Sequence, residues 1–158
     1  MAYLIRKATL DDIPEMIRLE RICPTAAHWT EQQYRDLFAT QGSIRAALMA
    51  QNNEGAEPVG FLIARHLAPD WELENIVVAG ESRRSGVGTQ LMQAFLTQAK
   101  QMKGESAFLE VRESNTAARA LYERLGFQPT GRRKSYYAAP LEDAVLYSKG
   151  LREDCNLA

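Results

Sequence analysis

Residues 82–92 read SRRSGVGTQLM, two arginines and two closely spaced glycines that lead into apolar residues at helical spacing. Such a turn has three interpretations: a tight turn alone, a phosphate loop for a nucleoside triphosphate, or a cradle for the pyrophosphate of another cofactor. A triphosphate loop reads G-x-x-x-x-G-K-[ST], and neither that spacing nor its lysine is present. A dinucleotide-binding loop reads G-x-G-x-x-G and needs a glycine or alanine at position 91, which is Leu91 here. The acidic residue that binds the ribose in such proteins has a candidate in Glu110, on the next expected strand.

The pattern that is left is R-x-x-G-x-G, formed by Arg83, Gly86 and Gly88. Glycines at this place let backbone N–H groups approach an anion, and the helix dipole adds about half a positive charge. Arg83 and Arg84 add charged donors for phosphate. A turn with solvated arginines is the alternative interpretation, and the six residues alone do not decide between the two.

The segments around this turn predict a strand, helix, strand unit. Residues 71–78, WELENIVV, alternate and then become wholly apolar, which is typical of a strand partly buried on both faces. The helix after Gly88 has apolar residues at helical spacing and ends at Lys103-Gly104. Residues 107–112, AFLEVR, form the next strand, so the two strands are expected to be parallel.

The rest of the chain predicts a mixed α/β fold. The expected elements are a strand at 3–9, a helix beginning after Thr9, a helix beginning at the capping box of Thr30, strands at 44–50 and 58–67, a helix between Asn115 and Gly126, and two extended segments, FQPTGRRKSYY and EDAVLYSKGL. With 158 residues, 46% of them hydrophobic, one domain over residues 1–150 is expected, followed by a polar tail at 151–158.

Composition argues against several classes of protein. The net charge of -1 gives no general reason to expect binding to nucleic acid or to an anionic membrane. No apolar run approaches the ~20 residues of a membrane span, and the start lacks the apolar stretch of a signal peptide, so a cytoplasmic location is expected. Cys23 and Cys155 form no C-x-x-C pair and are expected to be reduced thiols, and no metal site is expected. His28 and His66 are expected at the surface or rim.

Three residues downstream of the turn are candidates for chemistry. Glu110 and Arg112 alternate with apolar residues, so both side chains are expected on one face of their strand. That face is either solvated, or the two charges pair, or the glutamate has a chemical role. Tyr122 lies in the helix segment ALYERLG, where packing is the simpler interpretation. Asn115 is a good helix N-cap by itself.

The order of these motifs resembles a known family. R-x-x-G-x-G after NIVV, then LEVRESN, then N-x-x-A-x-x-L-Y-x-x-x-G-F is similar to the GCN5-related N-acetyltransferases (GNAT), and within them to the RimI type, which acetylates the N-terminal alanine of a ribosomal protein. The resemblance runs from AAHWTEQQY through RRKSYY and EDAVLYSKGL. It implies a mostly antiparallel sheet of six to seven strands, with strands four and five parallel and splayed, and about four helices.

The resemblance also implies acetyl-coenzyme A (acetyl-CoA) as the acetyl donor and coenzyme A as a product. The residues implied to hold it are Ile76, Val77 and Val78 along the pantetheine arm, Arg83, Arg84, Ser85, Gly86, Val87, Gly88 and Thr89 at the pyrophosphate, and Asn115, Ala118 and Tyr122 beside the arm. The backbone amide near Val78 is implied to polarise the thioester carbonyl. No metal takes part.

By the same resemblance, Glu110 is the general base and Tyr122 the general acid, with Glu72 as the competing base. Residues implied to contact the acceptor are Trp29, Glu72, Tyr136 and Tyr137. An α-amine has a pKa of ~7.7 to 8.0 against ~10.4 for lysine, so a neutral α-amine is roughly 3 kcal/mol easier to form. The expected reaction is direct acetylation of a protein N-terminus, without an acetyl-enzyme. The alternatives are a lysine or small-amine acetyltransferase and a non-catalytic acyl-CoA-binding module.

Overall fold

The computed structural model describes residues 3–39 and 44–152. Contacts between Cα atoms divide the chain into two compact units. The first contains the chain up to His66 together with Leu73–Phe95, and the second contains Leu67–Glu72 and the chain from Leu96 onward. One domain over residues 1–150 therefore stays a prediction, and most of the polar tail, with Cys155, lies outside the described residues.

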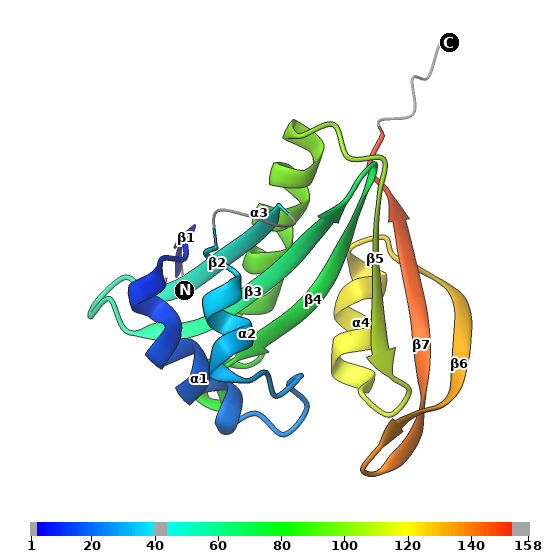
Figure 1. Ribbon diagram of the computed structural model, residues 1–158, viewed down its shortest axis with the longest axis horizontal. Helices are drawn as coiled ribbons and strands as arrows, with labels where there is room; N and C mark the ends of the chain where they lie inside the picture. Colours follow the sequence, from blue (N-terminus) through cyan, green and yellow to red (C-terminus); the bar gives the residue numbers. More distant parts are fainter. Residues whose placement is uncertain (1–2, 40–43, 153–158) are drawn as a thin grey trace. The chain divides into compact units, whose positions relative to one another are not determined.

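Seven strands form one mixed sheet (Figure 1). They are β1 (Tyr3–Lys7), β2 (Arg45–Asn52), β3 (Pro58–Leu67), β4 (Asp70–Val78), β5 (Ser106–Arg112), β6 (Gln128–Ala138) and β7 (Leu141–Gly150), and their hydrogen-bonded order is β1-β2-β3-β4-β5-β7-β6. The β4–β5 pair is parallel, with Trp71 opposite Ala107 and Glu72 opposite Phe108. The mixed sheet and its parallel pair of fourth and fifth strands confirm the fold expected from the sequence.

Four α-helices connect these strands within the described residues. They are α1 (Ile13–Arg21), α2 (Glu31–Asp36), α3 (Val87–Gln101) and α4 (Thr116–Arg124), and two 3₁₀ turns, η1 (Leu10–Asp12) and η2 (Gly80–Ser82), precede α1 and α3. Each of the four α-helices lies where the sequence predicts a helix. The expected N-caps are also present: Thr30 Oγ1 accepts the Gln33 N–H, and Asn115 Oδ1 accepts the Ala118 N–H at 3.2 Å.

The core of the first unit lies between its helices and one face of its strands. From α1, Ile13, Met16 and Leu19 stand at helical spacing and are buried. With Tyr34 of α2 they pack against buried strand residues, which are Met49, Phe61, Ile63 and Val77. Figure 1 shows α1 and α2 in front of β2–β4.

Gly60 explains how the first half of α3 approaches the other face of the same strands. A Cβ at this position would lie 2.7 Å from the carbonyl oxygen of Val77 and 3.3 Å from the Val87 side chain. The Cβ of any other residue would collide with the β4 backbone and press on Val87 of α3, so glycine admits the close approach of both.

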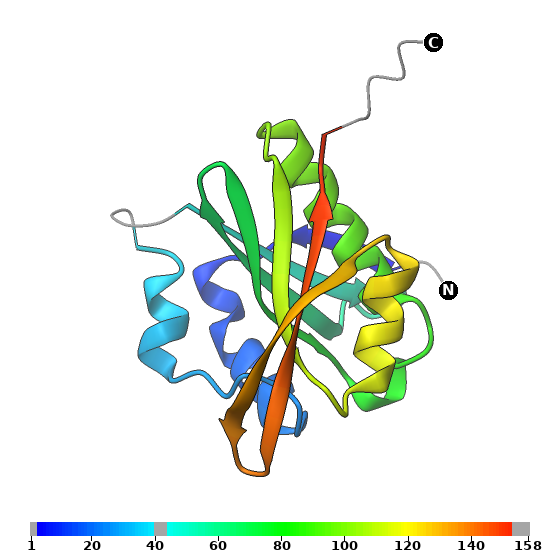
Figure 2. The ribbon, with the colours of Figure 1, turned by 90° about the vertical axis from the view of Figure 1, so that its right-hand side faces the viewer.

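The second unit joins β5, β7 and β6 with α4 (Figure 2). Tyr122 of α4 is buried, with ring centroids 6.0 Å from Phe127 and 6.2 Å from Tyr147. The Tyr147 hydroxyl donates to Glu123 at 2.8 Å and accepts from Arg119 at 3.0 Å, which ties α4 to β7. Tyr122 is thus packed against β7 within this unit.

The connection from β1 to α1 depends on Asp12. Its carboxylate accepts two hydrogen bonds from the Arg6 guanidinium, at 2.7 and 2.8 Å, and one from the Thr9 N–H at 2.7 Å. The hydrogen bonds from Arg6 lower the pKa of Asp12, against the opposing effect of burial. The ionised form of Asp12 therefore stabilises the folded chain.

Replacing Asp12 by asparagine should destabilise the chain by about 2 kcal/mol at pH 7, the size expected for hydrogen bonds to a charged group. Because the folded pKa lies below the unfolded value of ~3.9, this stabilisation is complete above pH ~4 and is lost as pH falls through the folded pKa. Urea unfolding of wild type and Asp12→Asn at several pH values measures it, with Asp11→Asn as the exposed control. A difference independent of pH down to pH 3 would contradict this explanation.

Candidate active site

The turn between β4 and α3 has the backbone that an anion site needs. Arg84 and Gly86 have positive φ values of 62° and 89°. The first helical hydrogen bond joins the Gln90 N–H to the Gly86 carbonyl at 3.0 Å, so α3 begins at Val87, slightly earlier than expected. The N–H groups at the start of a helix have no carbonyl partner within it, and here they belong to Val87, Gly88 and Thr89. The turn therefore presents free donors at a positive helix end.

Contacts within the first unit hold this turn in place. The Arg83 guanidinium donates to the Val78 carbonyl and to Cys23 Sγ, each at 3.3 Å. Ser85 Oγ accepts from the Tyr3 hydroxyl at 2.8 Å and donates to the Ser82 carbonyl. Arg83 thus contacts the end of β4, and both Arg83 and the neighbouring Arg84 are exposed.

The last residues of β4 offer an amide on the side away from β3. Ala79 donates its N–H to the Val59 carbonyl of β3 at 2.8 Å. Amides of successive strand residues point to opposite edges, so the Val78 N–H points away from β3. Val77 is buried, whereas Ile76 and Val78 are half-buried on the other face. This arrangement agrees with the role expected for the Val78 amide.

Glu110 lies in the second unit in a partly buried, charged setting. Its side chain is 22% exposed and pairs with Arg133 of β6, whose Nε lies 2.7 Å from Oε1. Arg112, on the same face of β5, pairs instead with Glu142 of β7 at 3.3 Å. The predicted charged face is present, and each of its two residues has a partner on another strand.

Two tyrosines of β6 lie close to this carboxylate. A hydrogen bond to Glu110 and the charge of Glu110 raise the pKa of Tyr136, and the charge of Glu72 adds a smaller effect. The rings of Tyr136 and Tyr137 meet edge to face at 5.1 Å, and the Arg112 guanidinium lies 4.2 Å from the Tyr137 centroid. The structure therefore brings both candidate bases together with these tyrosines.

Tyr122 occupies a different environment, because its side chain is almost fully buried. Burial raises the pKa of its hydroxyl, and the nearby Tyr137 adds to the shift. The hydroxyl is therefore neutral across the physiological range and is able to donate a hydrogen bond. Asn115 and Ala118 stand at the start of the same helix, both half-buried.

Comparison with known proteins identifies the family. The model of the acetyltransferase (GNAT) family matches residues 13–127. The chain belongs to this family. The GNAT membership expected from the motifs is confirmed, and with it an acetyltransferase.

Individual GNAT relatives cover nearly the whole chain. An N-alpha-acetyltransferase of Sulfurisphaera tokodaii is 30% identical over 94% of this chain and 93% of its own length. The [ribosomal protein bS18]-alanine N-acetyltransferase of Escherichia coli is 30% identical over 85% of this chain and 88% of its own. The crystal structure of the ribosomal-protein-S18-alanine N-acetyltransferase from Escherichia coli has a TM-score of 0.83 at 27% identity and covers 99% of both chains. The chain is thus similar to N-terminal acetyltransferases, including the RimI type.

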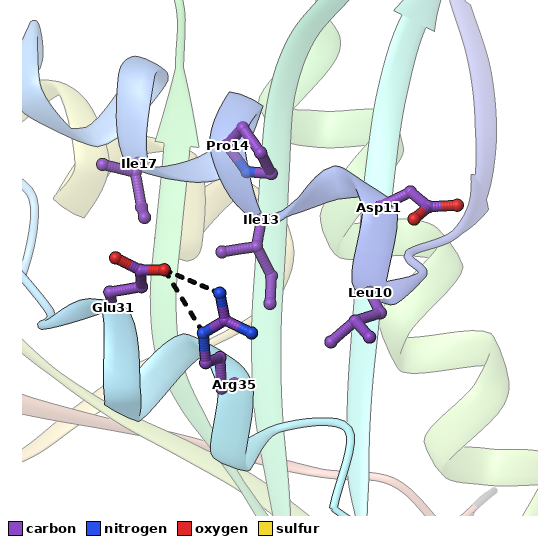
Figure 3. A pocket seen from close by; sticks show the side chains of 7 residues that line it. All are labelled: Leu10, Asp11, Ile13, Pro14, Ile17, Glu31 and Arg35. Carbon is purple, nitrogen blue, oxygen red and sulfur yellow. Dashed lines mark hydrogen bonds and ion pairs between the residues drawn. The ribbon is translucent and has the colours of Figure 1, made fainter.

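The GNAT chain also has a surface pocket apart from the predicted site (Figure 3). It measures about 360 Å³ and lies between α1 and α2, lined by Leu10, Asp11, Ile13, Pro14, Ile17, Glu31 and Arg35. The ion pair of Arg35 with Glu31, at 2.8 Å, crosses one side of it. No predicted site residue is among these lining residues.

Two other expectations concern metal and membrane. In the described ranges, 3–39 and 44–152, no group of three or more His, Cys, Asp and Glu side chains is arranged to hold a metal ion. No helix in those ranges is long and apolar enough to cross a membrane. His28 is exposed and His66 half-buried, as expected, and Cys23 is a buried free thiol.

Sequence reasoning missed three residues of the GNAT chain that hold predicted site residues or their partners. Arg133 pairs with Glu110, the buried Glu20 accepts the Trp29 N–H, and the buried Asn75 donates to Glu20. A signal for Glu20 was present, because it stands four residues after Met16 and therefore on the apolar face of its helix. Asn75 likewise falls among the buried alternate residues of β4.

Replacing Gly86 by alanine should weaken acetyl-CoA binding about tenfold. A residue with a Cβ at this positive φ costs about 1–2 kcal/mol, and relaxing that strain would turn the amides at the start of α3. Calorimetric titration with acetyl-CoA measures the effect. Gly80→Ala is the matched control, since a Cβ there meets nothing within 4 Å. Equal affinities of the two variants would contradict the assignment of this turn.

Proposed function

We propose that this GNAT enzyme transfers the acetyl group of acetyl-CoA to the N-terminal α-amine of a protein by direct attack, without an acetyl-enzyme. The observation that carries the proposal is the half-buried carboxylate of Glu110 beside Tyr136, on the strand parallel to β4. The names of the relatives, which act on protein N-termini, support the same class of acceptor.

The chain has groups that fit acetyl-CoA. Free N–H donors of Val87, Gly88 and Thr89 and the exposed Arg84 suit its pyrophosphate. The half-buried Ile76 and Val78 of the first unit suit the apolar pantetheine arm, and the roles of Asn115 and Ala118 of the second unit stay predictions from the sequence. Acetyl-CoA supplies a thioester carbonyl that the amine attacks. The Val78 N–H would stabilise the negative charge that develops on the carbonyl oxygen.

Glu110 and Tyr122 would act as the proton acceptor and the hydrogen-bond donor of the reaction. Roughly a tenth of the α-amine molecules are neutral at pH 7, so a modest base suffices to deprotonate the others. Glu110 would accept it, directly or through one water molecule. Tyr122 would donate a hydrogen bond to the departing thiolate, since burial keeps its hydroxyl protonated. Full proton transfer is not required, because a thiol (pKa ~8.5) is more acidic than a tyrosine (pKa ~10).

Tyr136 and Tyr137 of the second unit would contact the acceptor, and the contact of Trp29 with the acceptor stays a prediction from the sequence. Tyr136 is 52% exposed, so a large aromatic surface is open to a peptide. Glu72, half-buried near Tyr136, would face the α-ammonium group. A cytoplasmic location, where ribosomal proteins are made, stays a prediction.

The acceptor class is tested by thiol release from acetyl-CoA with two peptides. One begins with a free N-terminal alanine, and the other has the same sequence with its α-amine blocked and a lysine added. The proposal predicts release with the first peptide only. Release with the second alone would identify a lysine acetyltransferase instead, and release with neither would favour a small-amine enzyme or an acyl-CoA-binding module.

The base is tested by comparing Glu110→Gln with Glu72→Gln. Loss of a general base lowers the rate by about a hundredfold or more, so Glu110→Gln should lower kcat to that extent. Glu72→Gln should mainly raise the KM of the acceptor, because it removes a charge that attracts the ammonium group. Melting temperatures serve as the control for folding. A hundredfold loss of kcat in Glu72→Gln with near-normal turnover in Glu110→Gln would reverse the assignment.

A further inference from the structure

Glu20 of α1 is a carboxylate buried to 2% exposure that the proposed reaction does not use. Its Oε1 accepts the backbone N–H of Trp29 at 2.7 Å and the side-chain amide of Asn75 at 3.4 Å. Both donors are neutral amides, and they belong to different parts of the first unit. Glu20 thus joins α1, the segment at 22–30 that leads to α2, and β4.

Packing alone does not explain why a carboxylate occupies this buried position. Burying a charged group is costly, and an apolar residue of similar size often stabilises a fold as well or better. The charge of Glu20 also adds to burial in raising the pKa of the neighbouring Tyr34. Buried polar groups are best explained where they select one conformation among several.

The segment at 22–30 adopts an unusual backbone conformation that a buried carboxylate could select. His28, directly before Trp29, has a positive φ of 54°, which a non-glycine residue adopts only when its surroundings hold it. The hydrogen bond from the Trp29 N–H to Glu20 comes at the next residue. The Trp29 ring then lies 5.6 Å from the Tyr34 ring and packs against the core cluster. The carboxylate therefore holds the backbone of the residue whose half-buried indole packs there.

The same segment reaches the proposed acetyl-CoA turn. Cys23 Sγ contacts the Arg83 guanidinium at 3.3 Å, and Ala79, at the end of β4, packs against the same core cluster as Trp29. Cys23 does not depend on the Glu20 side chain, because its N–H donates to the main-chain carbonyl of Glu20 at 3.0 Å. A change of the Glu20 side chain leaves that main-chain bond in place, so its effect should fall on Trp29 rather than on the turn.

We propose that Glu20 is a positioning residue that fixes the segment at 22–30 through the Trp29 amide and thereby sets the affinity for the acceptor but not for acetyl-CoA. This inference rests on the proposed function, in which Trp29 contacts the acceptor. Glu20 itself touches neither substrate.

Three variants of the full chain test the proposal. Glu20→Leu removes the hydrogen-bond acceptor at similar side-chain size, and Glu20→Gln keeps an acceptor oxygen without the charge. Glu15→Gln is the control on the same helix, where the carboxylate is 39% exposed and pairs with Arg18. KM values for an N-terminal alanine peptide and for acetyl-CoA are measured, with exchange of backbone amides by NMR.

Glu20→Leu should raise the KM of the peptide about tenfold, as expected when a hydrogen bond to a charged group is lost, and leave the KM of acetyl-CoA within about twofold. Its Trp29 amide should exchange faster, whereas the Ala79 amide, bonded to Val59, should exchange as in wild type. Glu20→Gln should restore most of the affinity, with a rise of about threefold, since a neutral oxygen accepts more weakly. It also serves as the test if Glu20→Leu does not fold.

An unchanged peptide KM in a folded Glu20→Leu variant would overturn the proposal. Equal rises of both KM values, or equal acceleration of the Trp29 and Ala79 amides, would do so as well, because they indicate general destabilisation. If wild type acetylates no α-amine peptide, the proposed function fails. Amide exchange then decides separately whether Glu20 holds Trp29.

Discussion

The parallel pairing of β4 and β5 is the constraint on which the rest of the structure depends. Parallel neighbours cannot be joined by a tight turn, so the chain must cross over, and α3 is that crossover. The glycine turn therefore lies where β4 ends and α3 begins, with the free amides of the helix start beside it. Gly60 admits α3 close to the strands, and Gly86 supplies the positive φ that the turn requires.

Differences in burial give side chains of the same type different protonation behaviour and different hydrogen-bond partners. Tyr122 is buried among aromatic rings and keeps its proton, whereas Tyr136 is exposed and hydrogen-bonded to Glu110. Among the carboxylates, Glu110 is half-buried with an arginine partner, and Glu20 is fully buried with amide donors. Glutamate and tyrosine side chains of this chain would thus provide a proton acceptor, a neutral hydrogen-bond donor and a structural anchor.

The sequence predicted the elements, the parallel pair and the turn because each depends on local spacing. R-x-x-G-x-G and the N-cap of Asn115 are read from a few adjacent residues. The contacts of the site could not be read in this way. Arg133 reaches Glu110 because the two residues lie on one face of the sheet on either side of β7, with Arg133 opposite Ala144 and Glu110 opposite Leu146, and this strand pairing is not a local property of the sequence. The hydrogen bond from the Trp29 N–H to Glu20 likewise depends on the path of the segment at 22–30, which has no regular secondary structure and folds back onto α1.

The central claim is that one end of β4 holds acetyl-CoA while Glu110 and the β6 tyrosines receive a protein N-terminus. A crystal structure with coenzyme A joined through an acetyl group to the α-amine of an alanine peptide tests it most directly. We expect the pyrophosphate on the amides of residues 86–89, the former carbonyl oxygen at the Val78 N–H, and the peptide nitrogen within reach of Glu110. A pyrophosphate bound elsewhere, or a peptide nitrogen remote from both Glu110 and Tyr122, would contradict it.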